Sequence, residues 1–199
     1  MRSLLIYIII LLLIDGCAIR PEAKAPITKY YLEPNIKLDC TLSKNNKTMR
    51  LNFIEGVSYV SQKNITYTKS NLVAGSYLYS KWNQSPNHLI ATVLYSTLNK
   101  KNIFDNIVYE NELVNTDIAL NIQILQFEHK FYNAKNSTGV IALEALIYDT
   151  KTQRILASKL FTSEVEAKTN NAQGGVEALN EALGILLSKL ICWSVENCE

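Results

Sequence analysis

The chain has 199 residues, with 20 basic and 18 acidic side chains and a formal net charge of +2. This balance argues against a nucleic-acid-binding protein, which needs a basic excess to contact phosphates, and no stretch interleaves basic with aromatic residues. The length suits one domain with a core of ordinary size.

The first segment has the pattern of a bacterial export signal. One positive charge, Arg2, precedes eleven consecutive apolar residues from Leu4 to Ile14. At about 1.5 Å per residue, a helix of this length crosses only about half of a hydrocarbon core that is about 30 Å thick, so it is too short for a transmembrane span. A run of about 7–15 apolar residues after a positive charge is typical of a signal peptide.

The residues at the end of this run, LIDGC at 13–17, resemble the bacterial lipobox. In that motif the cysteine is acylated and becomes the mature N-terminus, which predicts lipidation of Cys17. Three acyl chains, at about 0.8 kcal/mol for each buried CH₂, form a stable membrane anchor. Asp15 is unusual in a lipobox, and the alternative is a secreted protein that is cleaved near Gly16 and keeps an ordinary thiol.

Residues 17–28 contain two of the four prolines and few apolar residues, so we expect a tether between the anchor and a folded domain. Residues 41–48 are polar and predict a turn. In the first half of the domain, β-branched and aromatic residues at period two predict strands, the first of which stops at Pro34. The strands are expected within 29–38, 49–60, 64–69, 76–82 and, at a sheet edge, 103–110.

A helix is predicted over 86–100, between the last two of these strands. Ser85 suits its N-cap, and Pro86 suits its first turn, where an N–H would have no helical partner. Ile90, Leu94 and Leu98 recur every four residues and form an apolar stripe.

The second half of the domain predicts three antiparallel strands followed by a long helix. The strands are expected within 116–132, 140–149 and 154–167. In the first strand the apolar alternation shifts after Ile124 and resumes at Phe127, which is typical of a β-bulge. The helix at 170–193 carries one apolar stripe, which indicates packing on the sheet. The stripe consists of Val176, Leu179, Leu183, Leu186 and Leu190.

These elements predict an α+β fold, a two-layer sandwich in which two helices pack on one face of a mixed, mostly antiparallel sheet. The other face would be half polar and open to contact. The expected organisation is a signal peptide at 1–16, a lipidated tether at 17–28 and a single α+β domain at 29–199.

Three cysteines remain besides Cys17, an odd number for an oxidising compartment. One disulfide and one free thiol are expected, and all three pairings are open. Closure of a short loop after the last helix favours Cys192–Cys198. Either pairing of Cys40 would instead tie the N-terminal arm to the C-terminus.

No residue pattern predicts catalysis or a cofactor. The chain lacks a Gly-rich phosphate loop, a Gly-x-Ser-x-Gly motif and a Cys-x-x-Cys motif. His88 falls in a predicted helix and His129 in a predicted strand, and neither has the neighbours of a catalytic triad or a metal site. Glu110 and Glu112 are typical of a solvated edge. We therefore expect no enzymatic activity, no metal and no cofactor.

Taken in order, these features resemble the ABC-type transport auxiliary lipoproteins of the paraquat-inducible protein C type. The resemblance covers most of 29–193 and includes the YYLEP arm, the segments SKWNQSPNHLIATVLYSTLNKKNIF and ALNIQILQFEHKF, and a terminal helix that ends in CW. Its most specific residues are Tyr79, Trp82, Pro86, Phe127 and Asp149.

The resemblance implies a non-catalytic periplasmic component of a phospholipid transport system. In such systems an ATPase and a permease act with proteins that carry the mammalian-cell-entry domain. The implied partners are that protein, the ABC permease complex, the membrane through the anchor and, as a further candidate, phospholipid. Asp after the lipidated cysteine marks inner-membrane retention in Gram-negative lipoproteins, so Ala18 implies the periplasmic face of the outer membrane.

Trp82, Tyr77 and Tyr79 are the candidates for partner contact, because aromatic residues are enriched at binding hot spots. The alternative for Trp82 is a place in the core between helix and sheet. Two other functions stay open: a scaffold or assembly lipoprotein of another outer-membrane machine, and a lipid carrier with an apolar cavity.

Overall fold

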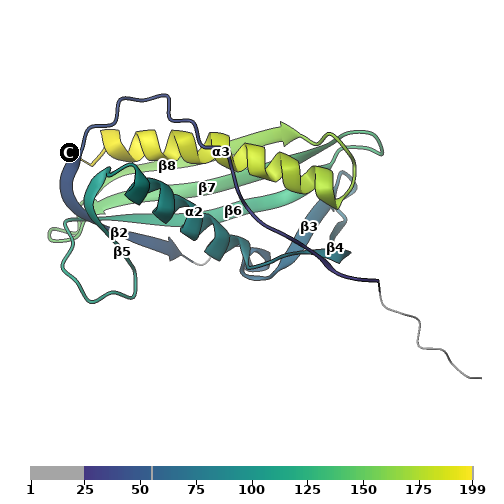
Figure 1. The fold of residues 1–199 in the computed structure, drawn as a ribbon, viewed down its shortest axis with the longest axis horizontal. Coiled ribbons are helices and arrows are strands. Elements are labelled where there is room, and N and C mark those ends of the chain that lie inside the picture. The colour runs from purple at the N-terminus through teal and green to yellow at the C-terminus, as the bar shows by residue number, and fades with distance from the viewer. Residues whose placement is uncertain (1–24, 55, 199) are drawn as a thin grey trace, which may run out of the picture.

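The computed structural model describes residues 25–54 and 56–198. In these residues eight strands form one mixed sheet, and both α-helices lie on the same face of it (Figure 1). The predicted two-layer α+β fold is confirmed. The elements are β1 (Thr28–Tyr30), β2 (Asn45–Ile54), the 3₁₀ turn η1 (Ser58–Ser61), β3 (Asn64–Lys69), β4 (Ala74–Trp82), α2 (Pro86–Lys100), β5 (Phe104–Tyr109), β6 (Ile118–Phe131), β7 (Ser137–Asp149), β8 (Ile155–Glu166) and α3 (Ala172–Glu196).

The central strand of the sheet is β6. On one side it pairs along its whole length with β7, which pairs in turn with β8, so the predicted antiparallel meander is confirmed. On the other side two shorter strands run parallel to it, β2 along its first half and β3 along its second half. Beyond them, β5 pairs with β2, β4 pairs with β3, and β1 adds parallel to the end of β4.

The predicted bulge in β6 lies at the junction between β2 and β3. The pairing register of β6 shifts between Ile124 and Gln126. There the backbone carbonyl of Ile124 accepts a hydrogen bond from the amide of Val57, on the segment that leads out of β2. A Cβ atom on Gly56 would lie 2.1 Å from that carbonyl oxygen, so only glycine lets the chain pass so close to β6.

Both helices bury the stripes that their sequences predict. α2 contacts β2 and β5, whereas α3 contacts β6, β7 and β8. The leucine and isoleucine residues of the two stripes are at most 1% exposed. α3 is long and apolar enough to cross a membrane, but 67% of its most apolar window is buried inside the domain, which identifies it as a core helix.

The arm that joins β1 to β2 runs along α3. It contacts the helix at four positions one helical turn apart, which are Asn180, Gly184, Ser188 and Cys192. Asn180 accepts a hydrogen bond from the Glu33 amide at 2.7 Å. Further along, a Cβ atom on Gly184 would lie 2.5 Å from the carbonyl oxygen of Asn35. Ser188 donates a hydrogen bond to the carbonyl of Lys37. We call residues 31–44 the strap.

A disulfide between Cys40 and Cys192 completes the attachment of the strap, and the predicted pairing of Cys192 with Cys198 is wrong. The pairing follows from the helix: Cys192 lies on the same face of α3 as the three attachment positions before it, four residues after the last of them. Cys198 is a free, buried thiol.

Three strands differ from the prediction. β1 begins at Thr28, inside the expected tether, and ends at Tyr30, four residues before Pro34. β2 begins at Asn45, inside the stretch expected to be a turn, because its amide bonds to the Ile103 carbonyl and the following residues pair with β5. The strand predicted over 49–60 ends at Ile54, and η1 follows it. In this stretch the chain crosses from the first half of β6 to the second.

Candidate functional site

Trp82, the first candidate for partner contact, is a core residue. It is 2% exposed, and its ring centroid lies 5.7 Å from that of Phe127 on β6. Its backbone amide bonds to the carbonyl of Lys63, and it pairs with Tyr30 of β1. Burial of the whole indole removes Trp82 from the candidates for contact.

Tyr77 is half-buried and faces His129, which is completely buried. The Tyr77 hydroxyl lies 2.7 Å from Nδ1 of His129, and Nε2 has no hydrogen-bond partner among the described residues. Loss of solvation lowers the pKa of His129 to about 4, and burial, with a smaller contribution from Tyr67, raises the pKa of Tyr77 to about 12. Both groups are therefore neutral at pH 7 and form a structural contact.

Close packing explains the pair of glycines at the start of α3, because Gly175 packs on His129 and Gly174 packs on Thr169. A Cβ atom on Gly175 would lie 2.4 Å from Nδ1 of His129, and one on Gly174 would lie 2.0 Å from the carbonyl oxygen of Thr169. The first turn of α3 therefore packs directly on the imidazole. Glu128, the sequence neighbour of His129, points to the opposite face of the sheet and accepts hydrogen bonds from Thr68 and Gln126, so it does not orient the imidazole.

The buried imidazole predicts a loss of stability in mild acid. Because the pKa of His129 is about 4 in the folded chain and about 6.5 when unfolded, the unfolded state binds more protons between these values. The free energy of unfolding should therefore fall by about 1–3 kcal/mol as the pH is lowered from about 6.5 to 4. Urea unfolding across this range tests this. His129→Phe should weaken the dependence of the free energy of unfolding on pH. An unchanged dependence would contradict the low pKa of His129 as its cause.

Tyr79, the third candidate, is exposed on an irregular part of β4. Asn64 of β3 pairs with Lys81 and Thr66 pairs with Ser76, so residues 77–80 of β4 lie opposite the single residue 65. The extra residues bend β4 away from β3. As a result Leu78 is 71% exposed and Tyr79 52% exposed, although both lie within a strand.

Tyr79 belongs to a larger group of exposed apolar residues at one end of the sheet. Leu72 is 99% exposed at the tip of the β3–β4 hairpin, where its φ of 63° places the backbone in the left-handed region. The neighbouring Val73 and, before β1, Ile27 are about half exposed. We call Ile27, Leu72, Val73, Leu78 and Tyr79 the hairpin surface.

The hairpin surface has basic and no acidic neighbours along its own strands. Lys29 lies on β1, and Lys69 and Lys81 lie on β3 and β4. From residue 56 to residue 104 the chain contains no acidic residue. At the same end of the sheet, acidic side chains such as Glu164 and Glu166 come from β8, on the far side of β6 and β7.

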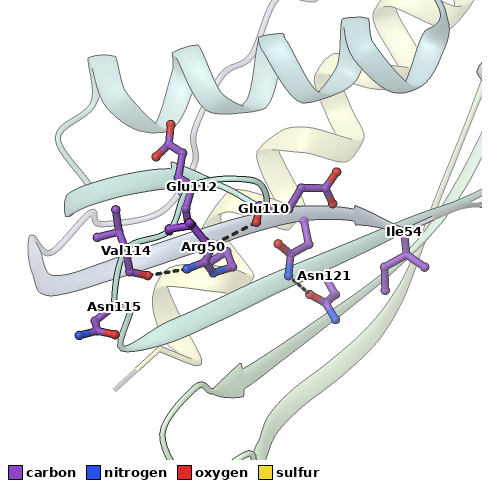
Figure 2. A pocket seen from close by; sticks show the side chains of 9 residues that line it. Arg50, Ile54, Glu110, Glu112, Val114, Asn115 and Asn121 are labelled. Carbon is purple, nitrogen blue, oxygen red and sulfur yellow. Dashed lines mark hydrogen bonds between the residues drawn. The ribbon is translucent and has the colours of Figure 1, made fainter.

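A second candidate region lies on the sheet face away from the helices, beside the loop between β5 and β6 (Figure 2). It is a shallow depression of about 750 Å³ around Arg50. The guanidinium donates to the backbone carbonyls of Glu112 at 2.8 Å and Val114 at 2.5 Å, and Asn52 donates to Asn121 at 2.7 Å. Because the Arg50 donors bind backbone oxygens, their evident role is to hold this loop against β2.

The remaining chemical candidates line two pockets that share Glu110. His88 is in the first turn of α2, beside a groove that Glu110 also lines. Glu112 lies in the β5–β6 loop near Arg50. Among residues 25–54 and 56–198, no three histidine, cysteine or acidic side chains form a group that could hold a metal ion.

The sequence could have indicated the hairpin surface through its charges. The absence of acidic residues from 56 to 104 is visible in the sequence. The exposure of Leu78 was not visible, because it depends on the irregular pairing of β3 with β4. Leu72 and Val73 fall between two predicted strands, where no local pattern indicates a contact surface.

The fold is similar to that of several solved structures. Protein XCC0632 from Xanthomonas campestris, described by the family model DUF330, superposes with a TM-score of 0.77 at 14% identity, over 86% of this chain and 96% of the other. An uncharacterised protein gives a TM-score of 0.62 at 14% identity, over 86% and 99% of the two chains. The hypothetical protein CT253 from Chlamydia trachomatis gives 0.51 at 6% identity, over 78% and 98%. At these identities the likeness concerns the fold alone.

The sequence assigns the chain to a family. The model of the ABC-type transport auxiliary lipoprotein component matches residues 40–190, and the chain belongs to this family. The resemblance seen in the sequence is therefore confirmed. A comparison with curated proteins found no match.

Proposed function

We propose that the protein is a lipid-anchored component at the periplasmic face of the outer membrane of a Gram-negative bacterium. There it docks an ABC-type phospholipid transport system that contains a mammalian-cell-entry-domain protein, and it catalyses no reaction itself. The observation that carries this proposal is the family match over residues 40–190. The motif LIDGC at 13–17 supports the anchor, although it lies outside the described residues.

Two structural features support docking in the periplasm. The disulfide between Cys40 and Cys192 suits an oxidising compartment. The depression around Arg50 is lined largely by polar and charged side chains, which suit contact with a partner better than shelter for acyl chains.

Cys17→Ala tests the anchor. The variant should lose labelling by a fatty-acid analogue and should leave the outer-membrane fraction, because no acyl chain can be attached. Cys198→Ala is the matched control, since it replaces another cysteine outside the disulfide and should keep both the label and the location. If the Cys17→Ala protein still sediments with the outer membrane, the lipid anchor is wrong.

Cross-linking in intact cells tests the partner. A C-terminally tagged chain would be cross-linked, solubilised in mild detergent and purified, and the proteins and lipids bound to it identified by mass spectrometry. Recovery of a mammalian-cell-entry protein with its permease is the expected result. Recovery of barrel-assembly or cell-wall proteins alone would instead identify a scaffold of another outer-membrane machine.

A further inference from the structure

We propose that the hairpin surface rests on the headgroups of the bilayer that holds the lipid anchor, and so fixes how the domain stands on the membrane. This inference rests on the anchor in the proposed function. Three features support it: the position at which the tether enters the fold, the exposed apolar side chains and the positive charge of the neighbouring lysines.

The pairing of β1 sets the direction of the tether. β1 is parallel to β4, with Thr28 opposite Ser80 and Lys29 opposite Lys81. Upstream of Thr28 the chain therefore leads back toward the start of β4, which is the tip of the β3–β4 hairpin. This end of the sheet lies opposite the β5–β6 loop, and the described chain begins there (Figure 1).

The length of the tether keeps this end near the membrane. Ten residues, 18–27, separate Cys17 from β1. Even a fully extended chain of this length spans at most about 35 Å, and a relaxed chain spans less. An acylated Cys17 therefore holds the edge formed by β1 and β4 close to the bilayer, where weak contacts gain from a high local concentration.

The exposed side chains at this end suit a membrane interface. Leu72 projects almost completely from the hairpin tip, and Leu78 and Tyr79 project from the bend in β4. Exposed groups of apolar side chains are uncommon on soluble proteins and mark contact with a membrane or a partner. Leucine and tyrosine are typical of the zone where headgroups meet acyl chains.

The charges favour a membrane over an apolar protein partner. Lys69 lies beside the hairpin tip, where its amide bonds to the carbonyl of Val73, and Lys81 lies two residues after Tyr79, opposite Lys29 of β1. The three strands that carry these lysines have no carboxylate. Lysines beside exposed apolar residues bind anionic phospholipid while the leucines enter the interface.

The test places a tryptophan at the hairpin tip of the full-length, acylated chain. Leu72→Trp is compared with Leu113→Trp, because Leu113 is also completely exposed. It belongs to the β5–β6 loop, and this loop lies at the opposite end of the sheet (Figure 1). Both variants keep Trp82 and Trp193 as a common background. Each is reconstituted into vesicles of phosphatidylethanolamine and phosphatidylglycerol with brominated acyl chains, which quench nearby tryptophan.

Leu72→Trp should show a blue shift and a loss of emission in brominated vesicles, and Leu113→Trp should show neither. Lys69→Gln combined with Lys81→Gln in the Leu72→Trp chain should reduce the quenching, and Lys100→Gln combined with Lys101→Gln, at the end of α2, should not. If the proteins float with the vesicles and Leu72→Trp is not quenched, the membrane contact is wrong and the anchor stands. If neither protein floats, the anchor is wrong, and this inference falls with it.

Discussion

Trp82→Ala should lower the free energy of unfolding by about 3–5 kcal/mol, because it removes a large buried side chain and leaves a cavity between β4 and β6. The indole is 2% exposed and packs against Phe127. Its neighbours belong to rigid strands that cannot close the space. Urea unfolding followed by circular dichroism measures the change.

Tyr79→Ala is the matched control, three residues earlier on the same strand. Tyr79 is 52% exposed, so its removal should change the free energy of unfolding by less than about 1 kcal/mol. Equal losses in both variants would contradict the division of the aromatic candidates into core and surface. A Trp82→Ala protein that folds normally and loses partner binding would show that Trp82 contacts the partner.

The meander and both helices could be predicted because their signals are local. Each stripe of α2 and α3 repeats with the period of one helix, and each strand of the meander alternates with its own pleat. Even the bulge in β6 was visible, because inserting one residue shifts the alternation within a single strand.

The course of the chain between β2 and β3 could not be predicted in this way. The strand at Asn45 depends on its pairing with β5, which lies about sixty residues away in the sequence. The end of β2 at Ile54 depends on where the bulge of β6 lies. In both places tertiary pairing overrides a local pattern that indicates something else.

The candidate site was predicted only in part for the same reason. The sequence identified Tyr77, Tyr79 and Trp82 as an aromatic group, but the irregular pairing of β4 decides which of them faces the core. Tyr77 turns toward His129, Trp82 toward Phe127, and Tyr79 toward solvent.

Removal of the disulfide should destabilise the domain about as much as Trp82→Ala. Cys40 and Cys192 are 152 positions apart, so the bond closes most of the folded chain into a loop. Closing this loop removes conformational entropy from the unfolded chain, which stabilises the folded state by at most about 5 kcal/mol. Cys40→Ala combined with Cys192→Ala should therefore lower the free energy of unfolding by about 3–5 kcal/mol. Reduction of the wild-type protein should match it, and both are measured by urea unfolding.

Cys198→Ala separates the bond from the loss of a thiol. Cys198 is buried and unbridged, so its replacement should cost only about 1 kcal/mol, the value of a small apolar group. If reduction of the wild-type protein leaves its free energy of unfolding unchanged, the bond does not stabilise the domain, and any loss in the double variant comes from the missing side chains.

The disulfide variant should also loosen the strap before the domain unfolds. Without the bond, the strap is held by the hydrogen bonds to Asn180 and Ser188 and by apolar contacts with the core. These contacts come from the buried Leu32 and the partly buried Ile36, Leu38 and Leu42. Hydrogen exchange should therefore become faster at residues 31–44 while the β6–β7 pair stays protected.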